Sequence, residues 1–111
     1  MKKELIEIKK PKFLASMKEL SAREQDFIAL VRCLDNQQGC FAGNEFFMDF
    51  FGISDSAVTK NITSLEKDGY LERKLVREKG FHIKRRVLKL SFSMKMKFKQ
   101  HEKEMEKYRK D

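Results

Sequence analysis

Residues 44–71 constrain the fold of this chain more than any other stretch, because they set two helix patterns on either side of a glycine. Asn44 is a suitable N-cap for a helix over residues 45–51. Gly52 follows directly and can adopt the left-handed conformation that ends a helix. We therefore expect a short helix that stops at a tight turn.

A second helix is predicted immediately after this turn. Ser54 can cap its N-terminus, and Asp55 is favourable in its electropositive first turn. Val58, Ile62 and Leu65 recur at i, i+4 and i+7, which places them on one buried stripe. Helix, glycine turn and helix are the frame of a helix-turn-helix, whose second helix enters the major groove of DNA.

The side of this second helix opposite the buried stripe carries hydroxyls and lysines. Such side chains are donors suited to base edges and phosphates. An ordinary solvated helix face has the same composition, so this face alone leaves both interpretations open. The candidate DNA contacts of this helix are Ser54, Ser56, Thr59, Lys60, Thr63 and Lys67.

The hydrophobic period changes from about 3.6 to about 2 after Gly69, which predicts extended strands. A turn signal, Glu-Lys-Gly at residues 78–80, separates a first run over residues 70–77 from a second run over residues 81–90. Two such runs joined by a short loop with a glycine predict a β-hairpin.

This predicted hairpin belongs to a strongly basic stretch. Between Arg73 and Lys99 there are eleven basic residues and one acidic residue, Glu78. A basic hairpin after a helix-turn-helix is typical of the wing of a winged helix, which lies along the sugar–phosphate backbone or reaches the minor groove. Its candidate DNA contacts are Arg73, Lys74, Arg77, Lys79, Lys84, Arg85 and Arg86.

Composition and charge bound the class of protein. With 111 residues, 41% of them hydrophobic and 38% charged, the chain suits one folded domain. Residues 1–71 carry 10 Lys/Arg and 11 Asp/Glu, whereas residues 72–111 carry 15 and 6. This asymmetry indicates a polyanionic partner, either nucleic acid or an anionic membrane. The sequence has no apolar run of membrane-spanning length and no signal-peptide pattern at its start, so we expect a cytoplasmic protein.

We divide the chain into an N-terminal arm (1–12), an α+β winged helix-turn-helix domain (13–90) and a basic C-terminal helix (91–111). The domain should have a three-helix core and a two- to three-stranded β-wing. Its first core helix opens with a capping box, Ser21 and Glu24, and runs to about residue 35. Residues 40–42 are expected to be extended, at the edge of the small sheet.

The helix predicted over residues 45–51 is unusually rich in phenylalanine, because it carries Phe46, Phe47, Phe50 and Phe51. These rings form two pairs one turn apart and cover more of the helix than one core contact needs. Either the core is thick, which we favour, or Phe46 or Phe50 packs on another segment or subunit.

The C-terminal segment from about Ser93 to Tyr108 has the composition of a helix. An apolar series within it follows the 4-3-4-3 spacing of a heptad seam. This seam can pack back on its own domain or against a second copy of the chain, and its spacing does not distinguish the two. The third alternative is a frayed basic tail. The candidate dimerisation residues are Met94, Phe98, His101, Met105 and Tyr108.

Several blocks together match a family pattern: LSARE at residues 20–24, GCFA at 39–42, FGIS at 51–54, AVTK at 57–60, Ile62, and LEKDGYL at 65–71. On these blocks, residues from about 8 to 90, roughly three quarters of the chain, resemble the winged-helix domain of plasmid and phage replication proteins and of DnaD-like replisome organisers. The last block is also similar to MarR-like regulators.

This resemblance implies DNA contacts from Ser56, Thr59, Lys60 and Thr63, and from the wing residues Lys79, Arg85 and Arg86. It implies neither catalytic residues nor a cofactor. Two features depart from the pattern. Phe47 and Met48 stand where the pattern usually has Leu-Ala, and the tail after Leu90 matches nothing in it.

These observations predict a sequence-specific, double-stranded DNA-binding protein that regulates transcription of a bacterial or mobile-element operon. The alternative is a DNA-binding factor for plasmid or phage replication initiation or maintenance, with a replication protein as partner. A homodimer is a candidate oligomer, and the sequence alone leaves the oligomeric state open. A third class, a protein-binding winged helix or an anionic-membrane binder, is the least favoured, and no membrane partner is expected.

An enzyme is not expected, because the sequence has no phosphate-binding glycine loop and no catalytic constellation. Cys33 and Cys40 with the distant His82 and His101 do not have the spacing of a zinc site, so neither a metal nor a cofactor is predicted. A disulfide between the two cysteines is disfavoured as well.

Overall fold

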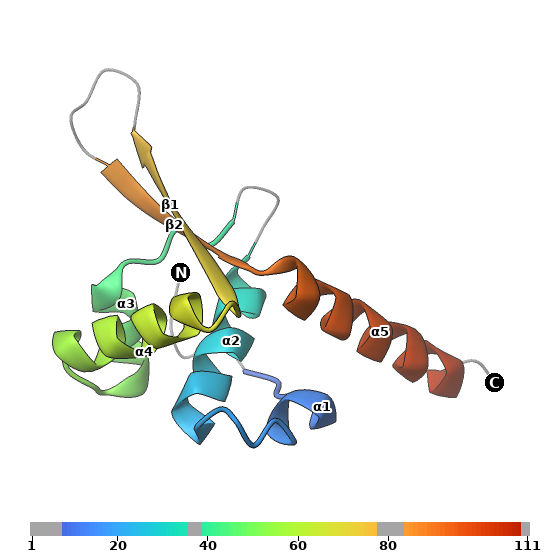
Figure 1. Ribbon diagram of the computed structural model, residues 1–111. Coiled ribbons are helices and arrows are strands. Elements are labelled where there is room, and N and C mark those ends of the chain that lie inside the picture. The colour runs from blue at the N-terminus through green and yellow to red at the C-terminus, as the bar shows by residue number, and fades with distance from the viewer. Residues whose placement is uncertain (1–7, 36–38, 78–83, 110–111) are drawn as a thin grey trace.

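The computed structural model describes residues 8–35, 39–77 and 84–109, and confirms an α+β class (Figure 1). Within these residues, four helices form the body of the molecule, a two-stranded antiparallel sheet rises from it, and a long helix follows the sheet. The elements are α1 (Lys12–Ala15), α2 (Ala22–Leu34), α3 (Asn44–Phe51), α4 (Asp55–Lys67), β1 (Leu71–Arg77), β2 (Lys84–Leu90) and α5 (Phe92–Arg109).

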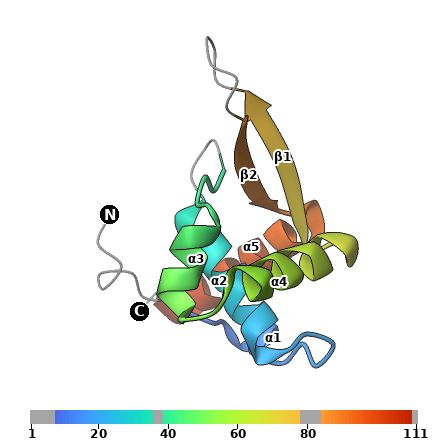
Figure 2. The ribbon, with the colours of Figure 1, turned by 90° about the vertical axis from the view of Figure 1, so that its left-hand side faces the viewer.

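The molecule is elongated, with principal extents of 52 × 29 × 29 Å. The β1–β2 hairpin and α5 leave the helical body in different directions (Figure 1). Seen from the side, α4 lies at the base of the hairpin and α5 lies behind it (Figure 2). The two views agree that α5 occupies the side of the molecule away from α4.

Local capping explains where the body helices begin and end. Ser21 and Glu24 form the predicted capping box, in which each side chain bonds the other residue's backbone N–H, at 3.1 and 2.9 Å. Gly52 ends α3 in the left-handed conformation, with a φ of 66°. Ser54 Oγ accepts from the backbone N–H of Ala57 and caps α4.

One predicted cap was wrong. Asn44 is not the N-cap of α3 but its first helical residue, and the N-cap position is held by Gly43 without a side-chain cap bond. The Asn44 side chain does not fold back onto its own helix, because it bonds α4 and β2 instead.

The core is built from one face of each body helix. Phe27 of α2 stacks on Phe47 of α3, with ring centroids 5.2 Å apart, and both rings are fully buried. The predicted stripe of α4 faces this pair, and Val58, Ile62 and Leu65 are all buried. Close packing of this kind makes large-to-small changes costly, at about 3–5 kcal/mol for a buried Phe→Ala.

The remaining rings of α3 support the thick core that we favoured. Phe46, Phe50 and Phe51 are partly buried and pack against the core cluster. Phe46 and Phe50 stack on each other at 6.0 Å, and Phe51 lies 4.9 Å from Phe27. A subunit contact by these rings stays a prediction.

The predicted hairpin is confirmed over the described residues, with antiparallel pairing from Leu71↔Leu90 to Arg77↔Lys84. Residues 78–83, which include the predicted turn and the start of the second run, lie outside the description. Cys40 adds a short third segment, because its backbone exchanges two hydrogen bonds with Leu88, at 2.9 and 2.8 Å.

The C-terminal helix begins at Phe92, close to the predicted start. Met94 and Phe98 are 0% and 5% exposed and belong to the same core cluster as the body helices. The first half of α5 is therefore an integral part of the domain predicted for residues 13–90, and not a detached tail. Of the N-terminal arm, residues 1–7 lie outside the described part, and Ile8 packs against the core.

Candidate nucleic-acid interface

The exposed side of α4 carries the predicted recognition residues. Ser56, Thr59, Lys60, Thr63 and Lys67 are all exposed, while the opposite side of the helix is buried in the core. With Asp55 and Ser64 they line one shallow surface hollow that runs along the helix. The sequence-predicted helix residues are thus brought together on one accessible face.

Ser54 differs from the other predicted contacts of α4, because it is the N-cap of this helix. Its Oγ accepts from the backbone N–H of Ala57 at 3.1 Å and lies 3.2 Å from Oγ of Ser56. A hydroxyl that caps a helix is held in place by that bond, so Ser54 positions the first turn of α4.

A polar bridge from Asn44 joins this helix to the hairpin. Asn44 Nδ2 donates to Oδ1 of Asp55 at 2.7 Å and to Oγ1 of Thr59 at 3.0 Å. Its Oδ1 accepts from Nη1 of Arg86 on β2 at 2.5 Å. Asn44 therefore contacts α4 and β2 at once. No local sequence signal could have indicated this bridge, because Arg86 is 42 residues away along the chain.

Arg86 was predicted to be a DNA contact of the wing, but the structure engages its guanidinium within the chain. Its guanidinium is half-buried, donates to Asn44 and to the backbone carbonyl of Ala42 at 2.8 Å, and lies 5.9 Å from the Phe47 ring centroid. Burial, and then the neighbouring charge of Arg73, lower the pKa of Arg86 from its ordinary value. Arg86 therefore anchors the hairpin to the body.

Arg73 also forms an ion pair within the chain, with Glu66. Its Nη2 donates to Oε1 of Glu66 at 2.6 Å, and its Nε donates to the other carboxylate oxygen at 3.3 Å. The hydrogen bond from Arg73 lowers the pKa of the Glu66 carboxyl. This fork-shaped pair ties β1 to the last turns of α4 and compensates the Arg73 charge, so we no longer count Arg73 as an open phosphate contact.

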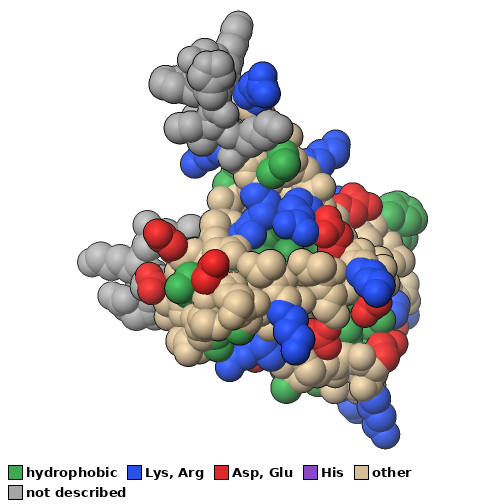
Figure 3. Space-filling view, turned by 60° about the vertical axis from the view of Figure 1, so that its left-hand side comes forward, with side chains coloured by type: hydrophobic (Ala, Val, Ile, Leu, Met, Phe, Trp, Pro, Cys, Tyr) green, Lys and Arg blue, Asp and Glu red, His purple; other side chains and the backbone are tan. Residues whose placement is uncertain are grey.

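The other predicted wing residues lie farther along the hairpin. Lys74 and Arg77 of β1 and Arg85 of β2 are exposed, and the Arg85 guanidinium lies 5.5 Å from the Phe41 ring centroid. Lys84 is placed on β2 but its side chain is not described, and Lys79 lies outside the described residues. Figure 3 shows Lys and Arg side chains gathered along the hairpin above a band of polar side chains and backbone.

Apolar residues interrupt this basic surface. Leu75, which the alternation placed among the apolar positions of β1, is 63% exposed, and Val76 is 42% exposed. Both lie beyond the part of β1 that packs on the body, since only Leu71 of this strand is buried. The exposed surface of the hairpin is thus apolar as well as cationic.

The predicted dimerisation residues divide into two groups. Met94 and Phe98 are buried in the chain's own core, and Phe98 packs on Phe13 at 5.0 Å and beneath Arg32 at 4.7 Å. These two residues are therefore not open to a second copy, which corrects that part of the predicted seam. Met105 and Tyr108 are 42% and 79% exposed and stay available to a partner.

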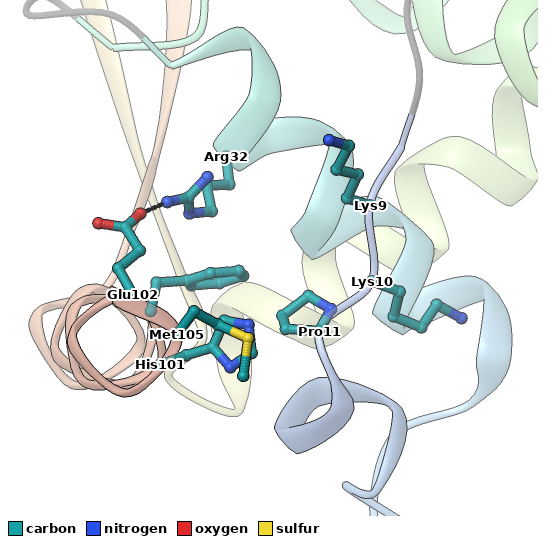
Figure 4. Close-up of a pocket in the computed structure, with 8 residues that line it drawn as sticks. Lys9, Lys10, Pro11, Arg32, His101, Glu102 and Met105 are labelled. Carbon is teal, nitrogen blue, oxygen red and sulfur yellow. Dashed lines mark ion pairs between the residues drawn. The ribbon is translucent and has the colours of Figure 1, made fainter. Parts of the chain in front are cut away.

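His101 lies between the two groups and lines a hollow at the junction of α5, α2 and the N-terminal segment (Figure 4). Figure 4 shows His101 and Met105 turned toward Pro11, while Arg32 forms an ion pair with Glu102 across the hollow. Lys9, Lys10 and Phe98 complete its lining, and Lys10 also pairs with Asp26 at 2.9 Å. The hollow therefore has an apolar floor, and two of its three lining cations, Arg32 and Lys10, are compensated by Glu102 and Asp26.

Metal-binding clusters and membrane-spanning helices are absent from the described part of the chain. It contains no group of three or more His, Cys, Asp or Glu side chains arranged to hold a metal ion. None of the helices in residues 8–35, 39–77 and 84–109 is long and apolar enough to cross a membrane. Cys33 is exposed and Cys40 is buried, and both thiols are free.

Comparisons of the chain with protein-family models, with curated proteins and with solved structures gave no match.

Proposed function

We propose that this protein is a sequence-specific, double-stranded DNA-binding protein, built as a winged helix, that regulates transcription of a bacterial or mobile-element operon. In this proposal α2, α3 and α4 form the three-helix core, α4 is the recognition helix, and the β1–β2 hairpin is the wing. The resemblance to replication and regulatory winged helices agrees with this assignment, but the assignment is argued from the geometry of the exposed surface.

The observation that carries the proposal is the exposed face of α4. It presents hydroxyls and lysines along one side of a helix whose other side is fixed in the core. A helix in the major groove reads bases with side chains of this type, while neighbouring cations contact phosphates. The side of α4 that would enter the groove is not covered by α5 in either view (Figures 1 and 2).

The hairpin supports the same orientation. Lys74, Arg77 and Arg85 are exposed on the hairpin, and the hairpin projects past α4 (Figure 2). The hydrogen bond from Arg86 to Asn44 holds β2 against α3, and the hydrogen bond from Arg73 to Glu66 holds β1 against α4. A duplex in contact with α4 would therefore meet these cations on its adjacent backbone.

Binding to a random duplex pool at increasing salt tests the proposal. We expect affinity to fall steeply with salt and a sequence motif to emerge from selection. Lys60→Ala should weaken binding to the selected duplex by about 1–3 kcal/mol if Lys60 reads a base. Glu45→Ala is the control on α3, because Glu45 is exposed and outside the α4 face. A chain without salt-dependent duplex affinity would end this proposal.

The alternative, replication initiation or maintenance of a plasmid or phage, uses the same DNA surface and adds a protein partner. The hollow beside His101 and Met105 supports it, because α5, α2 and the N-terminal segment line it and it shares no residue with the exposed face of α4. A replication protein captured by the wild type, and lost with Met105→Glu while DNA affinity is kept, would support this role. Capture unaffected by Met105→Glu would argue against it.

A further inference from the structure

We infer that Thr59 contacts DNA as a hydrogen-bond donor, held in this role by Asn44 and Arg86, and that it selects an acceptor atom on the nucleic acid. This inference rests on the proposed function and goes one step further, because it assigns a chemical preference to one side chain of α4. Its basis is the direction of the hydrogen bonds that run from β2 through Asn44 to α4.

The direction is set at Arg86, because a guanidinium can only donate. Its Nη1 donates to Oδ1 of Asn44 at 2.5 Å, which turns the Asn44 amide nitrogen toward α4. There Nδ2 donates to the Asp55 carboxylate at 2.7 Å, and an ionised carboxylate can only accept. A flipped amide would set donor against donor at Arg86 and acceptor against acceptor at Asp55, so only one orientation satisfies both neighbours.

The second proton of Asn44 Nδ2 is donated to Oγ1 of Thr59 at 3.0 Å. The Thr59 hydroxyl is therefore an acceptor toward the protein. Its own proton makes no hydrogen bond to any residue in the described ranges, and the side chain is exposed in the hollow of α4. A hydroxyl that already accepts a bond is polarised and becomes a better donor.

The ligand that satisfies this proton is an acceptor: a phosphate oxygen, or N7 of a purine, O6 of guanine or O4 of thymine on the major-groove edge. The exocyclic amines of adenine and cytosine are donors and do not satisfy it. Arg86 thus acts on DNA recognition through Asn44, as a positioning residue, without contacting DNA itself.

An isosteric exchange separates this role from a purely structural one. In Asn44→Asp the second carboxylate oxygen can only accept, so Thr59 must donate to residue 44 and its proton is lost to DNA. Adding Asp55→Asn puts a donor opposite the new carboxylate and keeps the net charge. The double variant N44D/D55N therefore rebuilds the contacts from Arg86 to α4 while the Thr59 hydroxyl stays reversed.

The experiment measures affinity for duplexes that the wild type selects from a random pool, together with the thermal unfolding of each variant. We expect Thr59→Val and N44D/D55N to lose affinity by about three- to tenfold, the usual contribution of one hydrogen bond. Thr59→Ser should bind as the wild type does, because it keeps the hydroxyl. N44D/D55N should unfold at the wild-type temperature.

Two modified duplexes then test two of these acceptors, purine N7 and a phosphate oxygen. If the acceptor is purine N7, 7-deazapurine substitution abolishes the difference between the wild type and Thr59→Val at one base pair. If the acceptor is a phosphate, a methylphosphonate at one position does so, and the loss is uniform across sequences. Either result supports the inference.

The inference would be overturned if Thr59→Val, or a folded N44D/D55N, bound the selected duplexes as tightly as the wild type does. In that case salt-dependent binding by the wild type leaves the proposed function in place. A wild type that does not bind duplex DNA overturns both.

Discussion

Arg77 and Arg86 lie on the same hairpin, yet their surroundings give them different roles. Arg77 is exposed at the far end of the described part of β1, whereas Arg86 is half-buried and bonded to Asn44 and Ala42. Charge patterning treats them alike, because it counts cations without knowing which ones the fold encloses. The sequence therefore predicted Arg86 as a DNA contact where the structure makes it an anchor.

Arg86→Ala should destabilise the fold by about 1–3 kcal/mol, because it leaves Asn44 and the Ala42 carbonyl without their donor. Arg77→Ala should leave stability unchanged and reduce the slope of log affinity against log salt by about 1. Urea unfolding and duplex titrations at several salt concentrations measure the two effects. If Arg86→Ala kept full stability, its anchoring role would have to be abandoned.

Gly39 provides a second prediction at the scale of one residue. Its φ is 107°, and a Cβ built on it would lie 2.4 Å from Cγ1 of Val87. Gly39→Ala should therefore destabilise the protein by about 1–3 kcal/mol through backbone strain and overpacking. Gly43→Ala is the matched control, because a Cβ there meets nothing within 4 Å and its φ is −87°. Equal urea midpoints for the two variants would contradict this.

At the scale of elements, much of the fold could be predicted because its signals are local. Ser21, Gly52 and Ser54 each act within one helical turn, and the structure places all three as predicted. The hairpin was predictable for the same reason, since alternation and a glycine turn are neighbours in sequence. Asn44 was misjudged because its partners are 11, 15 and 42 residues away, which no local pattern reveals.

The junction between α4 and β1 gives a pH prediction. The pKa of Glu66 is lowered in the folded state by the hydrogen bond from Arg73, below its ordinary value of 4.5. A carboxyl with a lowered pKa contributes stability above its unfolded pKa, and this contribution is lost as the pH falls through the folded pKa.

Glu66→Gln should therefore be less stable than the wild type at about pH 6, and the difference should shrink toward about pH 3. Since both partners are about one-third exposed, at 34% and 36%, the expected gap is a few tenths to about 1 kcal/mol. Urea unfolding across this range measures it. A gap that widens on acidification would have the wrong sign for this pair.

The two halves of α5 should respond differently to mutation. Phe98→Ala should destabilise the fold by about 3–5 kcal/mol, because this ring is buried against Phe13 and Arg32. Tyr108→Ala should leave monomer stability unchanged, since Tyr108 is 79% exposed. If the outer half of α5 carries a dimer contact, Tyr108→Ala should instead lower the dimer fraction in sedimentation. No sedimentation change in a dimeric wild type would remove Tyr108 from that contact.

At the scale of the whole molecule, the charge asymmetry of the sequence becomes a spatial one. The hairpin and α5 contain the basic excess, but they point in different directions from the body (Figure 1). Among the described residues, the basic hairpin joins α4 through β1, whereas α5 lies on the other side of the body (Figures 1 and 2), so the net charge of +8 overstates the charge available at the proposed DNA surface. The polyanionic partner that the sequence indicates stays a prediction, and the sequence could not show how the cations are divided between two sides of the molecule.

Because one cysteine is exposed and the other is buried, thiol modification can measure local opening of the fold at Cys40. Cys33 is exposed on α2, whereas Cys40 is buried where its backbone pairs with Leu88, and burial raises the pKa of its thiol. An alkylating reagent should modify the native protein once and quickly. The second modification requires the segment at Cys40 to separate from β2. Its rate therefore reports the frequency of local opening at the base of the hairpin while the rest of the chain stays folded.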